Sequence, residues 1–222
     1  MLLALVVLQT LRALTAIPGL DGHVAPAPEL LPACAPEVLR CAAVRLWIAP
    51  AGDGQPFDDL AFLTTQLTEA NREHGRAKLG FHVVEVRTLG ADAADIADRD
   101  DRDRLGHDRW QRGLIDVFVV SRLANVDDPG DIRGVHWRSR ADRRRRWVIL
   151  SRISPPRVLA HELGHYFGLP HSDVPVSLMN TGPRAAPERT FQPDELRRIE
   201  RRAKALFADG TVTDARAPGD RR

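Results

Sequence analysis

Residues 161–180 read HELGHYFGLPHSDVPVSLMN, and no other stretch of the chain is as informative. Three histidines stand at offsets of 0, 4 and 10, with a glutamate directly after the first: His161, Glu162, His165 and His171. Side chains four residues apart lie on one face of a helix, about 6 Å apart at Cβ, so the first two histidines can bind one metal ion. Gly168 permits a left-handed residue that ends the helix and turns the chain back toward that ion. The spacing therefore predicts a helix, a sharp turn and a metal site.

The ligand set indicates which kind of metal site this is. Three neutral histidine ligands leave a fourth position open, which is typical of catalytic zinc, because structural zinc sites are closed by four protein ligands, mostly cysteines. The chain has only two cysteines, which cannot form a closed site alone. Glu162 lies one step around the helix, where it can reach a water molecule without binding the metal. We therefore expect one catalytic Zn²⁺ on His161, His165 and His171, with Glu162 as the general base.

Residues 161–180 resemble the extended zinc motif and Met-turn of the metzincin clan of zinc metallopeptidases. Within the clan, the residues after the third histidine are most similar to the matrixins, the matrix-metalloproteinase family, here of bacterial type: Ser172, Val174, Pro175, Leu178 and Met179. The resemblance implies that Met179 lies beneath the zinc as the Met-turn residue. It also implies a zinc-dependent endopeptidase that hydrolyses peptide bonds by metal-activated water. A zinc-dependent amidase acting on a small-molecule or cell-wall peptide amide is the alternative.

The chain also departs from the matrixin pattern. It has no PRCGxPD segment, so the latency mechanism of matrixins does not carry over. Asn180 and Thr181 follow the Met-turn, so the tyrosine ligand of astacins and serralysins is absent and no fifth protein ligand is implied. The regions that supply structural Ca²⁺ or Zn²⁺ in matrixins have no clear counterpart. His107, Asp108 and His136 are candidate ligands for such an additional ion, and the alternative is that they are solvated loop residues.

The rest of the sequence predicts an α/β domain. Strands are expected at 44–48, 81–86, 114–120, 134–138 and 147–150, and helices at 57–74, from Ser154 as N-cap to Gly168, and at 193–207. The run at 114–120 is the most hydrophobic, so it is expected at the centre, whereas 134–138 alternates with polar residues and suits an edge. Residues 91–112 are expected to be mostly loop with one helical turn. This agrees with what the resemblance implies: the metzincin zincin-like fold, with a five-stranded mixed sheet, one antiparallel edge strand and three main helices.

Substrates are expected from the resemblance to be proteins or peptides, bound in extended form along strand 134–138 by β-augmentation. Arg184 and Arg189 are candidates to narrow or charge the pocket beyond the scissile bond. The formal net charge of +2 gives no global bias toward nucleic acid, so no nucleic-acid partner is expected, and we expect a monomer. The run Arg138–Arg146, RSRADRRRR, is typical of a solvated loop, and an electrostatic patch for a substrate or a polyanion is the alternative.

The length of 222 residues suits a single catalytic domain, expected at 43–207. Residues 1–27 contain an apolar stretch of signal-peptide length, too short and too broken to span a membrane stably, so we expect a secreted or periplasmic protein. Residues 28–42 are expected to be a linker or pro-segment remnant, and 208–222 a flexible tail. Cys34 and Cys41 suit a disulfide of an exported protein. Free thiols, an inhibitory zinc-binding Cys34 or a lipoprotein acylation site are the alternatives.

Overall fold

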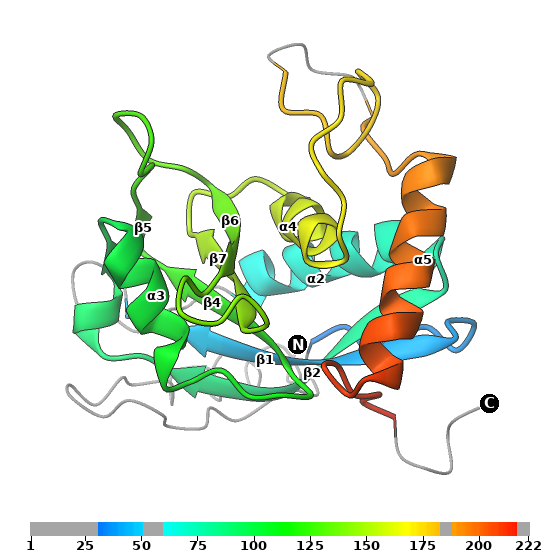
Figure 1. Cartoon of the computed structure of the whole chain (residues 1–222), viewed down its shortest axis with the longest axis horizontal. Helices are drawn as coiled ribbons and strands as arrows, with labels where there is room; N and C mark the ends of the chain where they lie inside the picture. The colour runs from blue at the N-terminus through cyan, green and yellow to red at the C-terminus, as the bar shows by residue number, and fades with distance from the viewer. Residues whose placement is uncertain (1–30, 51–59, 183–187, 217–222) are drawn as a thin grey trace, which may run out of the picture.

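A five-stranded sheet forms the centre of the computed structural model, which describes residues 31–50, 60–182 and 188–216 (Figure 1). The strand order is β2-β1-β4-β7-β6. The strands are β1 (Arg40–Ile48), β2 (Leu79–Thr88), β4 (Ile115–Val120), β6 (Gly134–Arg138) and β7 (Arg146–Ser151). All neighbours pair in parallel except β6, which is antiparallel to β7. The expected fold class is confirmed, with β4 in the middle and β6 at an edge.

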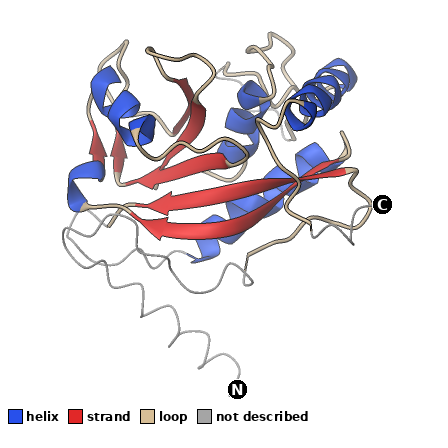
Figure 2. Ribbon diagram, turned by 60° about the horizontal axis from the view of Figure 1, so that its bottom comes forward, coloured by secondary structure: helices blue, strands red, loops and turns tan. Residues whose placement is uncertain are grey.

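Four α-helices surround the sheet in the described residues (Figure 2). They are α2 (Leu60–Gly75), α3 (Arg99–His107), α4 (Val158–Tyr166) and α5 (Pro193–Ala208). A short 3₁₀ turn, η2 (Ala91–Ala93), and a two-stranded sheet of β3 (Asp95–Ile96) and β5 (Arg122–Leu123) complete the structure. Within these described ranges, no helix combines the length and the apolar character that crossing a bilayer would require.

The helix α3 corrects the expectation that residues 91–112 are mostly loop. A capping box begins it, because the Asp98 carboxylate accepts a hydrogen bond from the Asp101 N–H and the Asp101 carboxylate accepts one from the Asp98 N–H. Leu105 is the one buried apolar side chain of this helix, so its sequence carries almost no apolar periodicity. The local cap and packing on the sheet therefore produce a fourth helix that an apolar pattern does not reveal.

Both faces of the sheet are buried, and they face different helices. Val44, Leu46 and Ile48 of β1 belong to a core shared with α2, α4 and α5. Trp47 and Ala49 point the other way, into a second core that includes Leu105 of α3. Figure 1 shows α3 at the end of the molecule away from α5. Because successive residues of a strand point to opposite faces, burial of both faces explains why the central strands are almost continuously apolar.

Ordered contacts extend beyond residues 43–207 on both sides. Leu31 and Val38 are buried, β1 begins at Arg40, and Cys34 forms a disulfide with Cys41, which confirms the pairing favoured from the sequence. On the C-terminal side, residues 211–215 lie within the segment expected to be a flexible tail. They hydrogen-bond to the start of β1 and to residue 113. The expected signal peptide at 1–27 lies outside the described residues.

Candidate active site

The helix α4 begins later than expected. Arg157 has a φ of 79° and lies in the left-handed region, so the first helical residue is Val158 and Ser154 is not the N-cap. The Ser154 hydroxyl instead lies within hydrogen-bond distance of two backbone carbonyls, that of Ser151 and that of Arg133 just before β6. The expected cap is wrong, because a hydrogen bond to a neighbouring loop uses the hydroxyl that would have capped the helix.

Gln66 of α2 supplies the missing cap from another helix. Its side-chain Oε1 accepts a hydrogen bond from the Leu159 N–H at 3.0 Å, and its Nε2 donates to the carbonyls of Pro155 at 2.9 Å and Ser154 at 3.2 Å. Gln66 is 2% exposed, so water does not compete for these groups. The first turn of the site helix is thus fixed by α2, which satisfies an N–H group that has no partner inside α4.

The other end of α4 closes at Gly168, which has a φ of 89°. The Gly168 N–H donates to the His165 carbonyl and the Leu169 N–H donates to the Gly164 carbonyl, both at 2.9 Å. This pair of hydrogen bonds is a Schellman motif, which needs a left-handed residue at this position. The chain therefore reverses as the sequence predicts, and His171 returns to the side of the helix that carries the first two histidines.

The three histidines lie together. Their candidate ligand atoms are all within 4.8 Å of one another, and the Nε2 atoms of His161 and His165 are 3.1 Å apart. Each of these two rings has its Nδ1 at 2.8 Å from a backbone carbonyl, that of Leu178 for His161 and of Leu169 for His165. Such bonds fix the ring orientation and leave Nε2 for a metal. The donor set fits a zinc ion with nitrogen ligands at about 2.0–2.1 Å.

Burial favours the neutral form of two ligand histidines, the form in which histidine binds metal. It lowers the pKa of His161, and it lowers the pKa of His165 to about 4, because a charged ring loses its hydration there. Within the described residues, this is the sole cluster of three or more metal-ligating side chains. His107 and Asp108 form an exposed pair at 2.6 Å, and the His136 ring packs on Tyr166, so these residues are not brought together with a further ligand.

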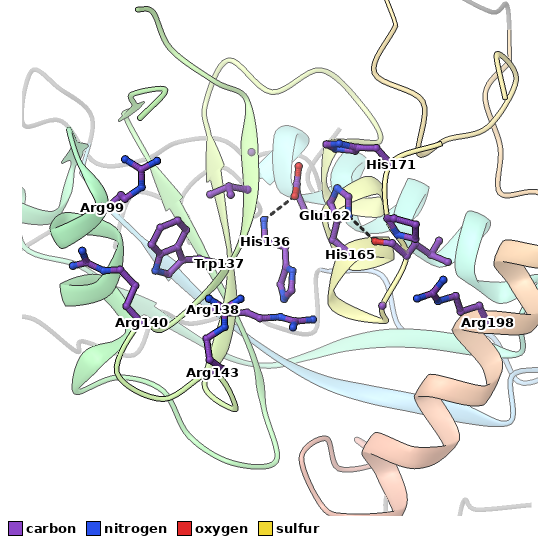
Figure 3. Close-up of a pocket in the computed structure, with 15 residues that line it drawn as sticks. Arg99, His136, Trp137, Arg138, Arg140, Arg143, Glu162, His165, His171 and Arg198 are labelled. Atoms are coloured by element: carbon purple, nitrogen blue, oxygen red, sulfur yellow. Dashed lines mark hydrogen bonds between the residues drawn. The ribbon is translucent and has the colours of Figure 1, made fainter. Parts of the chain in front are cut away.

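Glu162 lies beside the histidines and is held from β6. Its Oε2 accepts a hydrogen bond from the backbone N–H of His136 at 2.7 Å (Figure 3). Burial raises the pKa of Glu162 to about 8, while that hydrogen bond and the charge of Arg102 act in the opposite direction. A divalent cation on the histidines would lower the pKa of Glu162, since a nearby positive charge favours the carboxylate. The carboxylate is therefore oriented, and its proton affinity depends on the metal.

Met179 is fully buried under α4, against Gly164. A Cβ at Gly164 would lie 2.7 Å from the Met179 sulfur and 3.1 Å from the Phe191 ring, so only glycine lets the turn approach this closely. The Ser172 N–H donates to the Met179 carbonyl at 3.1 Å, which ties the segment after His171 to the same turn. Met179 thus supports the helix that carries two of the histidines.

Two clefts flank Glu162 along β6. The first, called here the basic cleft, has a volume of about 780 Å³ and is lined by His136, Arg138, His165 and His171 with several further arginines. The second has a volume of about 1010 Å³ and includes Gly134, Val158, Leu178 and Arg189 among its lining residues. Arg189 therefore lines a cleft beside Glu162, whereas Arg184 is outside the described residues. Glu162 lines both clefts.

Sequence reasoning missed three residues that shape this site. Gln66 interrupts the apolar face of α2 between Leu63 and Leu67, and a polar amide in such a stripe is the signal that could have found it. Gly164 has no signal beyond its small size within a helix. At Gly134, a Cβ would lie 2.6 Å from a Val158 methyl and 3.1 Å from Glu162 Cγ, so a glycine lets β6 approach α4.

The chain is similar to one protein family and to proteins of known structure. The family model described as Matrixin matches residues 51–201. Among solved structures, metalloproteinase-II from Bacteroides fragilis is 15% identical with a TM-score of 0.50, over 86% of this chain and 60% of that chain. Archaemetzincin from Methanopyrus kandleri is 17% identical with a TM-score of 0.48, over 73% of this chain and 96% of that chain. Curated protein sequences give no match.

The structural likeness to the Bacteroides protein concerns the fold, and this chain spans 60% of that protein's length. The Matrixin family model identifies the family as well, because it covers well over half of the chain and includes the zinc motif and the Met-turn. The protein therefore belongs to the matrixin family of the metzincin clan.

Proposed function

We propose that the protein is a zinc-dependent endopeptidase in which His161, His165 and His171 hold the zinc and Glu162 is the general base. The observation that supports this most directly is the convergence of the three histidines beside a buried carboxylate held by the His136 N–H. Three neutral ligands with an open position are the arrangement of catalytic zinc. Membership of the matrixin family supports the same function.

Zinc bound here would supply Lewis acidity toward a peptide carbonyl and toward the attacking water. Glu162 Oε2 accepts the His136 N–H, which leaves Oε1 as the oxygen without a protein donor that could serve the reacting groups. That oxygen takes a proton from water and then delivers it to the nitrogen of the leaving amine. Burial supports the first of these steps, because it raises the proton affinity of the carboxylate.

The edge strand β6 supports an extended mode of substrate binding. It is last in the strand order, and no strand of the described ranges pairs with its outer edge. A peptide that adds to this edge passes Glu162, which contacts β6 at His136. The two clefts continue on either side of Glu162. A chain can therefore extend in both directions from the scissile bond, which favours cleavage within a polypeptide over removal of terminal residues.

The test compares the wild type with Glu162→Gln on a proteome-derived peptide library read by mass spectrometry. We expect the variant to keep one zinc per chain by metal analysis and to lose at least about 100-fold in kcat/KM, as removal of a general base does. Glu200→Gln, an exposed change on α5, is the matched control and should retain activity. A chelator should abolish cleavage, and added zinc should restore it.

Near-native turnover by Glu162→Gln would refute the role of the carboxylate. Chelator-sensitive hydrolysis of small-molecule or cell-wall amides without cleavage of the library would favour the amidase alternative. Cleavage that is unaffected by the chelator would refute zinc catalysis altogether.

A further inference from the structure

The basic cleft has a strong imbalance of charge. Five arginines line it, and Glu162 is the single carboxylate among its lining residues. The arginines come from α3, from β6 and the loop after it, and from α5: Arg99, Arg138, Arg140, Arg143 and Arg198. Figure 3 shows Arg138 and Arg143 on one side of the cleft and Arg198 on the other. A cleft of one charge sign attracts ligands of the opposite sign.

Three of these arginines are available to a ligand. Arg99 pairs with an aspartate of a neighbouring loop, and Arg140 pairs with two aspartates of α3. By contrast, Arg138, Arg143 and Arg198 have no ion pair with any carboxylate in the described part of the chain. A guanidinium without a protein partner can form charge-assisted, two-pronged hydrogen bonds with a carboxylate from outside.

Arg138 has the least favourable surroundings of the three. It is half-buried, and burial together with the charges of Arg143 and Arg202 lowers its pKa. Arg202 lies nearby on α5, where its side chain covers Gly168. A half-buried cation among like charges is destabilised, and a carboxylate placed between them removes that repulsion. For this reason an acidic ligand fits the cleft better than a neutral polar ligand.

The direction of β6 places the arginines relative to the scissile bond. An antiparallel strand pairs slightly more stably than a parallel one, so a bound peptide runs opposite to β6. Its N-terminal part then lies over the Arg138 end. Arg138 is two residues along the strand from His136, which contacts Glu162, and this corresponds to about 7 Å. Side chains at the second to fourth positions N-terminal to the scissile bond therefore reach the basic cleft.

We propose that the basic cleft selects acidic peptides, with Asp or Glu at the second to fourth positions N-terminal to the scissile bond bound by Arg138, Arg143 and Arg198. The proposal rests on the proposed endopeptidase function and names its substrate class. It also gives a role to part of the arginine-rich run, whose exposed Arg144 does not line the cleft.

The test uses the zinc-loaded full-length protein and two fluorogenic peptides taken from a cleaved library sequence. The peptides share every residue except that one has Glu and the other has Gln at the second to fourth N-terminal positions. We expect kcat/KM to be about tenfold higher for the Glu peptide, mainly through a lower KM. The ratio should shrink toward one in about 1 M salt, where charges are screened beyond about 3 Å. A third peptide with Glu on the C-terminal side should gain less, because Arg157 and Arg189 of the second cleft already bond to groups of this chain.

Two double variants assign the effect to the cleft. Arg143→Gln with Arg198→Gln should bring the Glu/Gln ratio close to one. Arg144→Gln with Arg201→Gln removes two charges from the same loop and helix at exposed positions outside the cleft, and it should keep the ratio. Equal loss in both double variants would show a general charge effect and would overturn the proposal.

Binding separates this inference from the proposed function. Fluorescence anisotropy of the same labelled peptides with the Glu162→Gln protein measures selectivity without turnover. If the wild type cleaves nothing in the library, the endopeptidase function fails, and anisotropy with a Glu-containing peptide and its matched Gln peptide still tests the cleft. Equal cleavage and equal binding of the two peptides would refute the cleft's role alone. Displacement by a sulfated polysaccharide, with no preference between the peptides, would identify a polyanion site and overturn the proposal.

Discussion

Replacing Gln66 by alanine tests whether the site helix depends on a cap from another helix. The change removes the acceptor of the Leu159 N–H and the donor to the carbonyls of Pro155 and Ser154. The Pro155 carbonyl keeps a long contact with the Val158 N–H at 3.4 Å, whereas the Leu159 N–H is left buried without a partner. An unsatisfied buried group costs about 1–3 kcal/mol, and the lost side-chain packing adds to this. We therefore expect a loss of about 2–4 kcal/mol in the free energy of unfolding.

Urea unfolding followed by circular dichroism, at a fixed zinc concentration, measures this loss. Thermal unfolding gives a second measure. For a chain of this length, each kcal/mol lost from the free energy of unfolding lowers the melting temperature by about 2–4 °C, so we expect a fall of about 5–15 °C. Thr68→Ala, an exposed change on the same helix, is the control and should stay within about 0.5 kcal/mol of the wild type. A loss below about 1 kcal/mol for Gln66→Ala would refute the reasoning, because the Leu159 N–H would then have found another partner.

Three further outcomes are expected. Gly164→Val should cost about 2–3 kcal/mol by unfolding and weaken zinc affinity in a competition titration, because its Cβ would collide with Met179; unchanged zinc affinity would argue against support by the Met-turn. Burial lowers the pKa of His74 to about 4, against about 6.5 when unfolded, so the unfolded state binds more protons between these values. Stability should therefore fall by about 3 kcal/mol as the pH drops from about 6.5 to about 4, and a pH slope in His74→Leu as steep as in the wild type would contradict this. Replacing Cys34 and Cys41 together by serine should cost about 2 kcal/mol by urea unfolding, since the bridge closes a short loop, and a reductant should then have no further effect.

Much of the architecture could be predicted, because it depends on local patterns of apolar and polar residues. The apolar run now seen as β4 predicted a central strand, and the polar alternation at 134–138 predicted an edge strand. The helix α3 could not be found in this way, since its stability comes from a capping box and from one buried leucine. Apolar periodicity indicates the face of a helix that packs on the core. A helix with almost no apolar residues shows no such periodicity.

The metal site was equally visible in the sequence. His161 and His165 share a helix face by their spacing, and Gly168 allows the turn that returns His171, so the cluster needs few contacts from elsewhere. The orientation of Glu162 could not be predicted in the same way, because the group that orients its carboxylate is the backbone N–H of His136. A backbone group is present at nearly every residue, so no sequence pattern could single this one out.

By itself, the sequence determined the elements and ligands that depend on neighbours within about ten residues. These are the alternating strands, the ligand spacing and the left-handed turn at Gly168. The tertiary structure alone decided where α4 begins, through Gln66 of α2, and which arginines remain unpaired beside the site. The physical reason is that a hydrogen bond or an ion pair between distant segments depends on where the fold places both partners, and residue type does not encode that placement.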